Sequence, residues 1–460
     1  MDEITFGTDG WRATLDTFTS PRVRAVGQAV ADYLESEGHG GETVAVGYDA
    51  RGSSPGFADD LADVLTGNGF DVLLPERDLP TPAVAWTVRE RELAGGLMLT
   101  ASHNPPEYNG VKFLPGDGAP ALPEVTERIE ANLREADPEG PAGERREEDL
   151  VGPYLDHAAE FVADVEGAFD LAGTRICYDA MHGSGRGVTD ELLERAGAEV
   201  ERLRTDHDAE FGGTSPEPRA DRLEHLVGRV TDGDADLGVA NDGDADRVAV
   251  VTPEGFVDAN LLYVALYDYL LESQSGPAVR TVSTTFLVDR VAEAHGEETY
   301  ETAVGFKWVA DAMREHDALF GGEESGGYGL TAHLRNKDGV LVAGLAAAAH
   351  AAEPIEERLA AIREAHGEAH QDRISVDCPD ERKEAVLAAL ADELPDSVGG
   401  VDVSRVNDVD GFKILLEDGS WLLVRPSGTE PKLRVYAEAG SEERVAELLE
   451  EGRELVEPLV

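Results

Sequence analysis

Short apolar runs alternate along much of the chain with longer segments in which apolar and polar residues recur at helical spacing. Small or polar loops separate the two kinds of segment. Three such pairs are Thr43–Tyr48 with 57–68, Arg175–Tyr178 with 187–196, and Arg280–Ser283 with 286–295. Strands that alternate with helices are typical of α/β layers with mostly parallel strands. The pattern therefore predicts three related α/β domains.

The last part of the chain has a different order of elements. It reads as a strand, a helix, three strands and a final helix, at 372–378, 382–394, 411–416, 421–425, 433–438 and 442–455. Strands bracketed by two helices predict a small α+β domain, unlike the first three.

Shifts in composition place the limits between these domains. Pro, Gly and charged residues gather at 137–143, and further breaks lie at 253–255 and 365–367. With 460 residues, the chain is long enough for three or four domains of roughly 100–200 residues each. We predict α/β domains with mixed sheets at 1–150, 151–254 and 255–368, and an α+β domain at 369–460.

The charge of the chain is strongly negative, since 39 Lys and Arg stand against 94 Asp and Glu, a net charge of −55. Such a surface repels nucleic acid and anionic lipid, so we expect neither as a partner. Acid spread evenly through a foldable chain also indicates adaptation to high salt, where screening removes much of the self-repulsion.

Cysteine usage and hydropathy indicate the compartment. Cys177 and Cys378 match no metal-binding spacing, and we expect both to be buried thiols in a reducing environment. The N-terminus carries no secretory pattern, and no apolar run reaches the length of about 18 residues that a membrane span needs. We expect a cytoplasmic protein.

The first motif with chemical potential is Thr100-Ala101-Ser102-His103-Asn104-Pro105, which follows the apolar run 96–99. Asn-Pro favours a turn, so we expect Ser102 to be exposed at the carboxyl end of a strand, where open α/β sheets hold ligands. A serine hydroxyl there can carry a phosphoryl group covalently, with His103 beside it as a further catalytic candidate. A lone Ser-His pair more often only caps a turn, so the other motifs have to decide.

The second motif, Asn241-Asp242-Gly243-Asp244-Ala245-Asp246-Arg247, carries three aspartates at alternate positions between two apolar strands. This spacing brings three hard oxygens to one cation. A calcium EF-hand is excluded, because Arg247 stands where its glycine belongs and Pro253 where its glutamate belongs. We predict a magnesium site in a loop, with Arg247 able to pair with a phosphate at the same site.

Two further loops contain groups that suit a sugar phosphate. Gly321–Gly327 offers the Glu323 carboxylate and the Ser325 hydroxyl to sugar hydroxyls. Arg425–Pro431 can cradle a phosphate with Arg425, Ser427, Thr429 and the backbone around Gly428. Either loop alone is weak, since glycine-rich acidic loops and hairpin turns with a paired arginine are common.

Together these motifs resemble the α-D-phosphohexomutase family over essentially the whole chain. Phe6–Arg12 resembles its N-terminal signature, and the four motifs above resemble its phosphoserine, magnesium, sugar and phosphate loops in the same order. The resemblance implies four domains around a central cleft. It also implies phosphoryl transfer between C1 and C6 of a hexose, through phosphoserine 102 and a hexose 1,6-bisphosphate intermediate.

The resemblance also implies roles for single residues. Mg²⁺ would bind Asp242, Asp244 and Asp246 together with the phosphorylated Ser102. Arg12 and Lys112 would lie near the phosphoserine, with Lys112 a candidate general acid or base. The segment Gly305-Phe306-Lys307-Trp308 resembles the glucose-type members, in which the lysine helps to hold the substrate.

One departure concerns the proton relay. Many mannose- and glucosamine-type members carry histidine directly after Ser-Gly of the sugar loop, whereas Gly327 stands here and the nearest histidine is His333. We expect hexose phosphates as substrates, with glucose favoured and mannose accepted. A phosphoglucosamine mutase, a Ser/Mg-dependent sugar phosphatase and a non-catalytic acidic calcium-binding protein are the alternatives.

Overall fold

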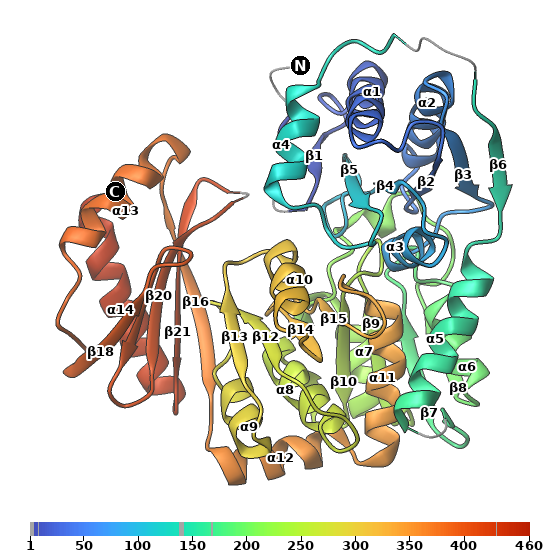
Figure 1. The fold of residues 1–460 in the computed structure, drawn as a ribbon. Coiled ribbons are helices and arrows are strands. Elements are labelled where there is room, and N and C mark those ends of the chain that lie inside the picture. The colour runs from blue at the N-terminus through green and yellow to red at the C-terminus, as the bar shows by residue number, and fades with distance from the viewer. Residues whose placement is uncertain (1–3, 8, 138–141, 167–168, 429) are drawn as a thin grey trace.

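The computed structural model describes residues 4–7, 9–137, 142–166, 169–428 and 430–460. Four structural units follow one another in an arc, with the N-terminal unit and the C-terminal unit at its two ends (Figure 1). Residues 138–141, the centre of the linker predicted at 137–143, and Thr429 of the phosphate loop lie outside the described residues.

The first unit is a six-stranded mixed sheet with helices on it. Its strand order is β1-β5-β4-β2-β3-β6, in which β1, β5 and β4 pair antiparallel and the others pair parallel. The central strands β2 and β4 are almost fully buried, as expected for apolar runs covered on both faces. The elements are β1 Trp11–Thr14, α1 Ser20–Ser36, β2 Thr43–Tyr48, α2 Ser54–Gly67, β3 Asp71–Pro75, α3 Thr81–Glu90, β4 Gly95–Leu99, β5 Tyr108–Pro115, α4 Pro123–Ala131 and β6 Arg145–Glu148.

The second unit has a five-stranded mixed sheet in the order β11-β10-β9-β7-β8. Its elements are α5 Val151–Glu166, β7 Arg175–Asp179, α6 Thr189–Arg195, β8 Glu199–Leu203, α7 Glu224–Thr231, β9 Leu237–Asn241, β10 Val248–Thr252 and β11 Gly255–Val257. The break predicted at 253–255 is the turn of the β10–β11 hairpin. The predicted limit at 254 therefore separates two paired strands, and by sheet membership the unit extends to Val257.

The third unit has a four-stranded mixed sheet in the order β13-β12-β14-β15. Its elements are α8 Ala259–Leu270, β12 Ala278–Thr281, α9 Leu287–His295, β13 Thr299–Thr302, α10 Phe306–Glu315, β14 Phe320–Gly322, β15 Tyr328–Leu330, α11 Gly339–Ala352 and α12 Ile355–His366. Helix α11 packs against α5, α6 and the strands β9 and β10, so it joins the second and third units.

The fourth unit is antiparallel throughout, in the order β16-β21-β20-β19-β18-β17. Its elements are β16 His370–Asp377, α13 Asp380–Asp392, β17 Ser397–Val398, β18 Val401–Asn407, β19 Phe412–Leu416, β20 Trp421–Pro426, β21 Lys432–Ala439 and α14 Glu442–Val456. The small α+β domain is confirmed. Strand β18 was missed because most of its residues are exposed and only Val401 and Val403 pack on the core of the unit.

The hydrophobic cores show which units are packed together. One continuous core runs through the first three units, from Ala45 and Trp86 to Leu237 and Phe320. The fourth unit has its own core and meets the third through a small cluster around Val282 and Trp421. Both cysteines are buried and free, as expected. Among the described helices, none has the length and apolar character to cross a bilayer.

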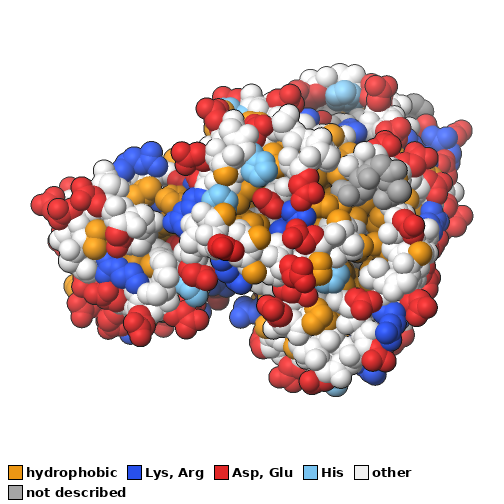
Figure 2. Space-filling view, turned by 90° about the horizontal axis from the view of Figure 1, so that it is seen from below, with side chains coloured by type: hydrophobic (Ala, Val, Ile, Leu, Met, Phe, Trp, Pro, Cys, Tyr) orange, Lys and Arg blue, Asp and Glu red, His pale blue; other side chains and the backbone are white. Residues whose placement is uncertain are grey.

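On the face seen in Figure 2, acidic side chains are spread out and do not form a single patch. Figure 2 shows Asp and Glu distributed over the whole visible face, with Lys and Arg in fewer places. Because the net charge is −55, repulsion between these carboxylates opposes the compact state unless salt screens it.

We therefore expect stability to rise steeply with salt. The Debye length falls from about 10 Å at 0.1 M to about 3 Å at 1 M, which removes most repulsion between exposed carboxylates. The melting temperature measured at 0.1 and 1 M KCl checks this. A melting temperature that stays level between the two concentrations would contradict the predicted adaptation to high salt.

Candidate active site

Ser102 lies in the loop after β4, with its backbone in the left-handed region at φ 51°. Its Oγ donates a hydrogen bond to Asp242 Oδ2 at 2.7 Å, which joins the first unit to the second. The expectation that Ser102 is exposed is wrong, since its exposed fraction is 0%. The aspartate loop covers it so closely that a Cβ at Gly243 would lie 2.6 Å from Ser102 O.

Arg51 holds the serine loop, and sequence reasoning missed it. Its Nη2 donates to Ser102 O at 2.8 Å and to Asn104 O at 2.7 Å, while Nη1 donates to Pro105 O at 2.7 Å. Asp49 fixes the guanidinium through Nε at 3.0 Å. Arg51 is almost fully buried, so the backbone of this loop, including its left-handed residue, is set by one guanidinium.

The three aspartates of the second motif form one buried cluster. One oxygen from each of Asp242, Asp244 and Asp246 lies within 4.8 Å of the others. Asp244 Oδ1 and Asp246 Oδ1 are buried and have no hydrogen-bond partner among the described residues. Orphaned carboxylate oxygens are costly unless something compensates them, and hard oxygens at this spacing suit a divalent cation.

The electrostatics of the cluster also fit a cation. Burial raises the pKa of Asp242 well above its ordinary value, and the neighbouring Asp244 and Asp246 raise it further. Burial acts to raise the pKa of Asp244 as well, but the Lys112 ammonium lowers it overall. Asp242 is thus the carboxylate whose charged form is disfavoured overall, and it is the one that contacts Ser102.

Two lysines meet the aspartates from the other side. Lys112 Nζ of β5 lies 2.9 Å from Asp244 Oδ2 and 2.8 Å from Asp246 Oδ2. Lys337 Nζ lies 2.9 Å from Asp246 Oδ2. Both ammonium groups also contact Asp9 Oδ2, at 2.9 and 3.2 Å. Burial acts to lower the pKa of each lysine, but the aspartates raise both above the ordinary value.

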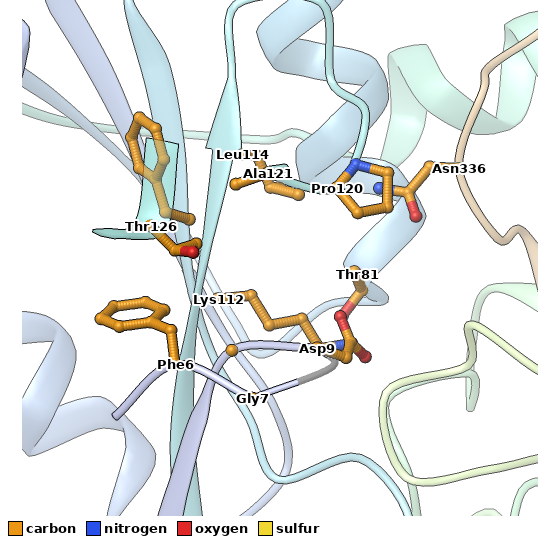
Figure 3. A pocket seen from close by; sticks show the side chains of 12 residues that line it. Phe6, Gly7, Asp9, Thr81, Lys112, Leu114, Pro120, Ala121, Thr126 and Asn336 are labelled. Carbon is orange, nitrogen blue, oxygen red and sulfur yellow. The ribbon is translucent and has the colours of Figure 1, made fainter. Parts of the chain in front are cut away.

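Figure 3 shows the Lys112 side chain reaching from β5 toward Asp9, with Thr81 close by. The cavity beside them has a volume of about 20 Å³ and is lined in part by Phe6 and Asn336. This volume admits about one water molecule.

Lys337 occupies the space beside Gly327, the residue directly after Ser-Gly of the sugar loop. A Cβ at Gly327 would lie 2.5 Å from Lys337 Cδ, so the absence of a side chain there lets the lysine pass. His333 points elsewhere: its ring nitrogens lie 2.7 Å from Asp338 Oδ2 and 2.9 Å from His157 Nε2. The residue that lies next to Gly327 of the sugar loop is therefore Lys337, and not His333, the nearest histidine in sequence.

The remaining predicted residues of the transfer site lie around Ser102. His103 Nδ1 is 3.3 Å from Ser102 Oγ, and burial lowers its pKa well below the ordinary value, which favours the neutral ring. Arg247 Nε lies 3.9 Å from Asp246 Oδ1 and has no hydrogen-bond partner in the described chain. Arg12 is held by Asp9 at 3.0 Å and by Asn104 Oδ1 at 3.3 Å.

The sugar loop lies between β14 and β15. Gly305 N donates to Glu323 Oε1 at 2.9 Å, and Ser325 Oγ lies 3.5 Å from Glu323 Oε2. Burial raises the pKa of Glu323 to about 7, although the Lys337 ammonium acts to lower it. Lys307 of α10 reaches the first unit, with Nζ 3.4 Å from Gly7 O.

Glu323→Gln is expected to stabilise the protein at pH 8 and not at pH 4.5. The carboxyl ionises at about 4.5 when unfolded but at about 7 in the fold, so its stabilising protonated form is lost as pH rises through 7. Gln can still accept from Gly305 N and avoids a cost of about 3 kcal/mol above pH 7. Melting temperatures of both proteins at the two pH values test this, and an equal difference at both would contradict it.

The phosphate loop follows β20 in the fourth unit. Arg425 Nε donates to Asp410 Oδ2 at 2.9 Å, and the buried Ser427 precedes the exposed Gly428. Lys383 of α13, which sequence reasoning also missed, donates to Ser427 O and Glu430 O, both at 2.6 Å. The Lys383 ammonium group thus holds two backbone carbonyls of the loop. Thr429 lies outside the described residues.

Comparison with known proteins defines the class. Family models of phosphoglucomutase/phosphomannomutase match in four consecutive parts: alpha/beta/alpha domain I at 3–139, domain II at 152–255, domain III at 258–366 and the C-terminal domain at 374–455. The chain therefore belongs to the phosphoglucomutase/phosphomannomutase family of α-D-phosphohexomutases, which are intramolecular phosphotransferases.

Individual relatives cover the whole chain under several names. A Methanopyrus kandleri protein named Probable phosphoglucosamine mutase is 36% identical over 98% of this chain and 97% of its own length. A Thermococcus kodakarensis protein named Phosphoglucomutase/phosphomannomutase is 33% identical over 98% of both chains. A crystal structure from Thermus thermophilus, described as a candidate phosphomannomutase, superposes with a TM-score of 0.85 at 33% identity and covers 99% of both chains.

Proposed function

We propose that this phosphohexomutase interconverts hexose 1-phosphate and hexose 6-phosphate through a phosphoserine at Ser102. The observation that carries the proposal is the hydrogen bond of 2.7 Å from Ser102 Oγ to Asp242, inside a buried carboxylate cluster with orphaned oxygens. A buried hydroxyl beside a cation site and shielded from water suits phosphoryl transfer to a sugar rather than hydrolysis.

In the proposed transfer, the bond between phosphorus and Ser102 Oγ breaks as a substrate hydroxyl oxygen forms a new bond to the same phosphorus. The hydroxyl proton passes to a base of the site, and Ser102 leaves as an alkoxide that takes up a proton. The hexose 1,6-bisphosphate then turns around and returns its other phosphoryl group to Ser102 by the reverse step.

Asp242, Asp244 and Asp246 would hold Mg²⁺ together with an oxygen of phosphoserine 102. Bound there, the ion supplies Lewis-acid stabilisation of the charge on the transferring group. Lys112 and Lys337 are the proposed proton-handling residues, since both border the aspartates and both are buried. Arg12, Arg247 and the neutral His103 would contact the phosphoryl oxygens around Ser102.

The substrate would extend from Ser102 to the phosphate loop. Glu323 and Ser325 are proposed to bind sugar hydroxyls, Lys307 to assist them, and Arg425, Ser427, Gly428 and Thr429 to bind the phosphate that is not reacting. The four domains at 1–150, 151–257, 258–368 and 369–460 would each supply one of these loops, and we propose a cytoplasmic location.

Glucose phosphates are the proposed favoured substrates, on the basis of the Gly305-Phe306-Lys307-Trp308 segment and the second glutamate of the sugar loop, Glu324. Glu323 would accept from the 3- and 4-hydroxyls, which glucose and mannose share, so mannose phosphate should react too. A sugar whose hydroxyl at C2 leaves a buried polar group unpaired is disfavoured by about 1–3 kcal/mol. This corresponds to a kcat/KM that is lower by roughly 5- to 150-fold.

The test is kcat/KM for the 1-phosphates of glucose, mannose and glucosamine, in high salt with Mg²⁺. The glucose value is expected to be the largest, with mannose measurable. A glucosamine phosphate that reacts best would replace glucose in the proposal, and the name of the Methanopyrus kandleri relative favours that second candidate. Release of inorganic phosphate as the main product would indicate a phosphatase instead.

A further inference from the structure

A carboxylate that the sequence motifs do not include holds the arginine of the phosphate loop. Asp410 Oδ2 accepts from Arg425 Nε at 2.9 Å, and the two side chains are only 16% and 11% exposed. The same oxygen accepts from Val304 N at 3.1 Å. Asp410 and Arg425 belong to the fourth unit and Val304 to the third, so one oxygen atom joins the phosphate loop to the neighbouring unit.

The segment that receives Asp410 also holds the sugar loop. Gly305 N, the amide next to Val304 N, donates to Glu323 Oε1 at 2.9 Å. Gly305 has φ 123°, a region that favours glycine. Two consecutive amides therefore bind two carboxylates, one that contacts Arg425 and one that is proposed to bind sugar hydroxyls.

The turn before β19 is shaped to bring Asp410 to this place. Gly411 has φ 80°, and a Cβ there would lie 2.2 Å from Val424 O and 2.8 Å from Arg425 Cα. The backbone of the turn thus touches the strand that carries Arg425. No other residue fits this contact without strain, so the approach of Asp410 to the guanidinium is built into the backbone.

We propose that Asp410 is a positioning residue for substrate binding, which orients Arg425 toward the phosphate and sets its distance from the sugar loop. A guanidinium is planar, so a carboxylate on its Nε edge also fixes the direction of the remaining donors. Because Val304 and Gly305 are adjacent, the phosphate subsite and the sugar subsite are tied together. The inference rests on the proposed function, since it takes Arg425 as a ligand of the substrate phosphate.

The first test compares Asp410→Asn, Arg425→Ala and the double variant. Asn is nearly isosteric and can still accept from Val304 N, but it does not pair with the guanidinium charge. We expect Asp410→Asn to raise KM for hexose 1-phosphate, and the inhibition constant of inorganic phosphate, at least about tenfold with kcat changed far less. In the double variant, Asp410→Asn should change neither constant beyond the effect of Arg425→Ala, because Asp410 acts through that arginine.

The matched control is Asn407→Asp in the preceding strand. Asn407 donates to Glu301 across the same interface and accepts from Val409 N. The Asp variant keeps the local turn and loses the hydrogen bond from residue 407 to Glu301, yet does not touch Arg425. It should leave the inhibition constant of phosphate unchanged while lowering the melting temperature.

The outcomes separate the two proposals. If Arg425→Ala leaves KM and phosphate inhibition unchanged, the proposed phosphate role of that loop falls, and the positioning role falls with it. If Arg425→Ala weakens phosphate binding but Asp410→Asn does not, the positioning role alone is overturned. The same holds if the effects of Asp410→Asn and Arg425→Ala multiply, or if Asn407→Asp reproduces the effect of Asp410→Asn.

Discussion

Ser102→Ala should lower kcat by at least about a thousandfold, because it removes the atom that carries the phosphoryl group and not merely a group that assists it. The fold should remain. The loop backbone is held by Arg51 through Ser102 O and Asn104 O, and these bonds do not involve the hydroxyl. Without the hydroxyl, Asp242 loses one hydrogen bond, but no large cavity forms.

Two measurements separate this result from a general loss of structure. Intact mass should show one phosphoryl group on part of the wild-type protein and none on Ser102→Ala. Ser53→Ala is the matched control, since Ser53 Oγ accepts from Asn109 of β5 and lies outside the aspartate cluster. Turnover of Ser102→Ala within about tenfold of the wild type would overturn the phosphoserine assignment.

Exhaustive removal of divalent cations should abolish turnover, and Mg²⁺ should restore it. Without a cation, burial and the neighbouring aspartates disfavour the charged form of Asp242, and two carboxylate oxygens of the cluster have no partner among the described residues. A divalent ion offsets both costs and binds only the folded site. At a concentration of about 100 times its dissociation constant, it should add roughly 2.7 kcal/mol to the free energy of unfolding.

The acidic surface requires a careful control for this experiment. Mg²⁺ also screens exposed carboxylates, so the melting temperature should be compared with and without Mg²⁺ in 2 M KCl for the wild type, Asp242→Asn and Asp221→Asn. Asp221 is exposed and distant from the cluster in the chain, with 70% of its side chain accessible. A rise that persists in Asp242→Asn, or full activity after chelation, would disprove the site.

Much of the fold was predictable because each strand and helix has a periodic pattern of its own. The three α/β units, the small α+β unit and the elements with clear periodicity follow from runs such as Thr43–Tyr48, where consecutive apolar residues are buried on both faces of a sheet. The aspartate cluster was predictable for the same local reason, since three carboxylates at alternate positions of one loop lie close together in any fold that keeps the loop.

Other features depend on residues that are far apart in the chain and carry no local pattern. Arg51 and Lys383 are single cations in ordinary helix-associated segments, and only their carbonyl partners, 44 to 57 residues away, reveal what they hold. Lys337 was overlooked although lysine is rare in this chain, because nothing near it in sequence points to Asp246 or to the space above Gly327.

By itself, the sequence determined the chemistry that is available: a serine after a strand, three carboxylates in one loop, and two loops suited to a sugar and a phosphate. The tertiary structure decided how these groups meet. It buried Ser102 against Asp242, placed two ammonium groups on the aspartates, and tied Arg425 through Asp410 to the loop that holds Glu323. The reason is physical: local periodicity selects strands and helices, whereas hydrogen bonds and ion pairs between distant residues form only when packing of the units brings their atoms within about 3 Å.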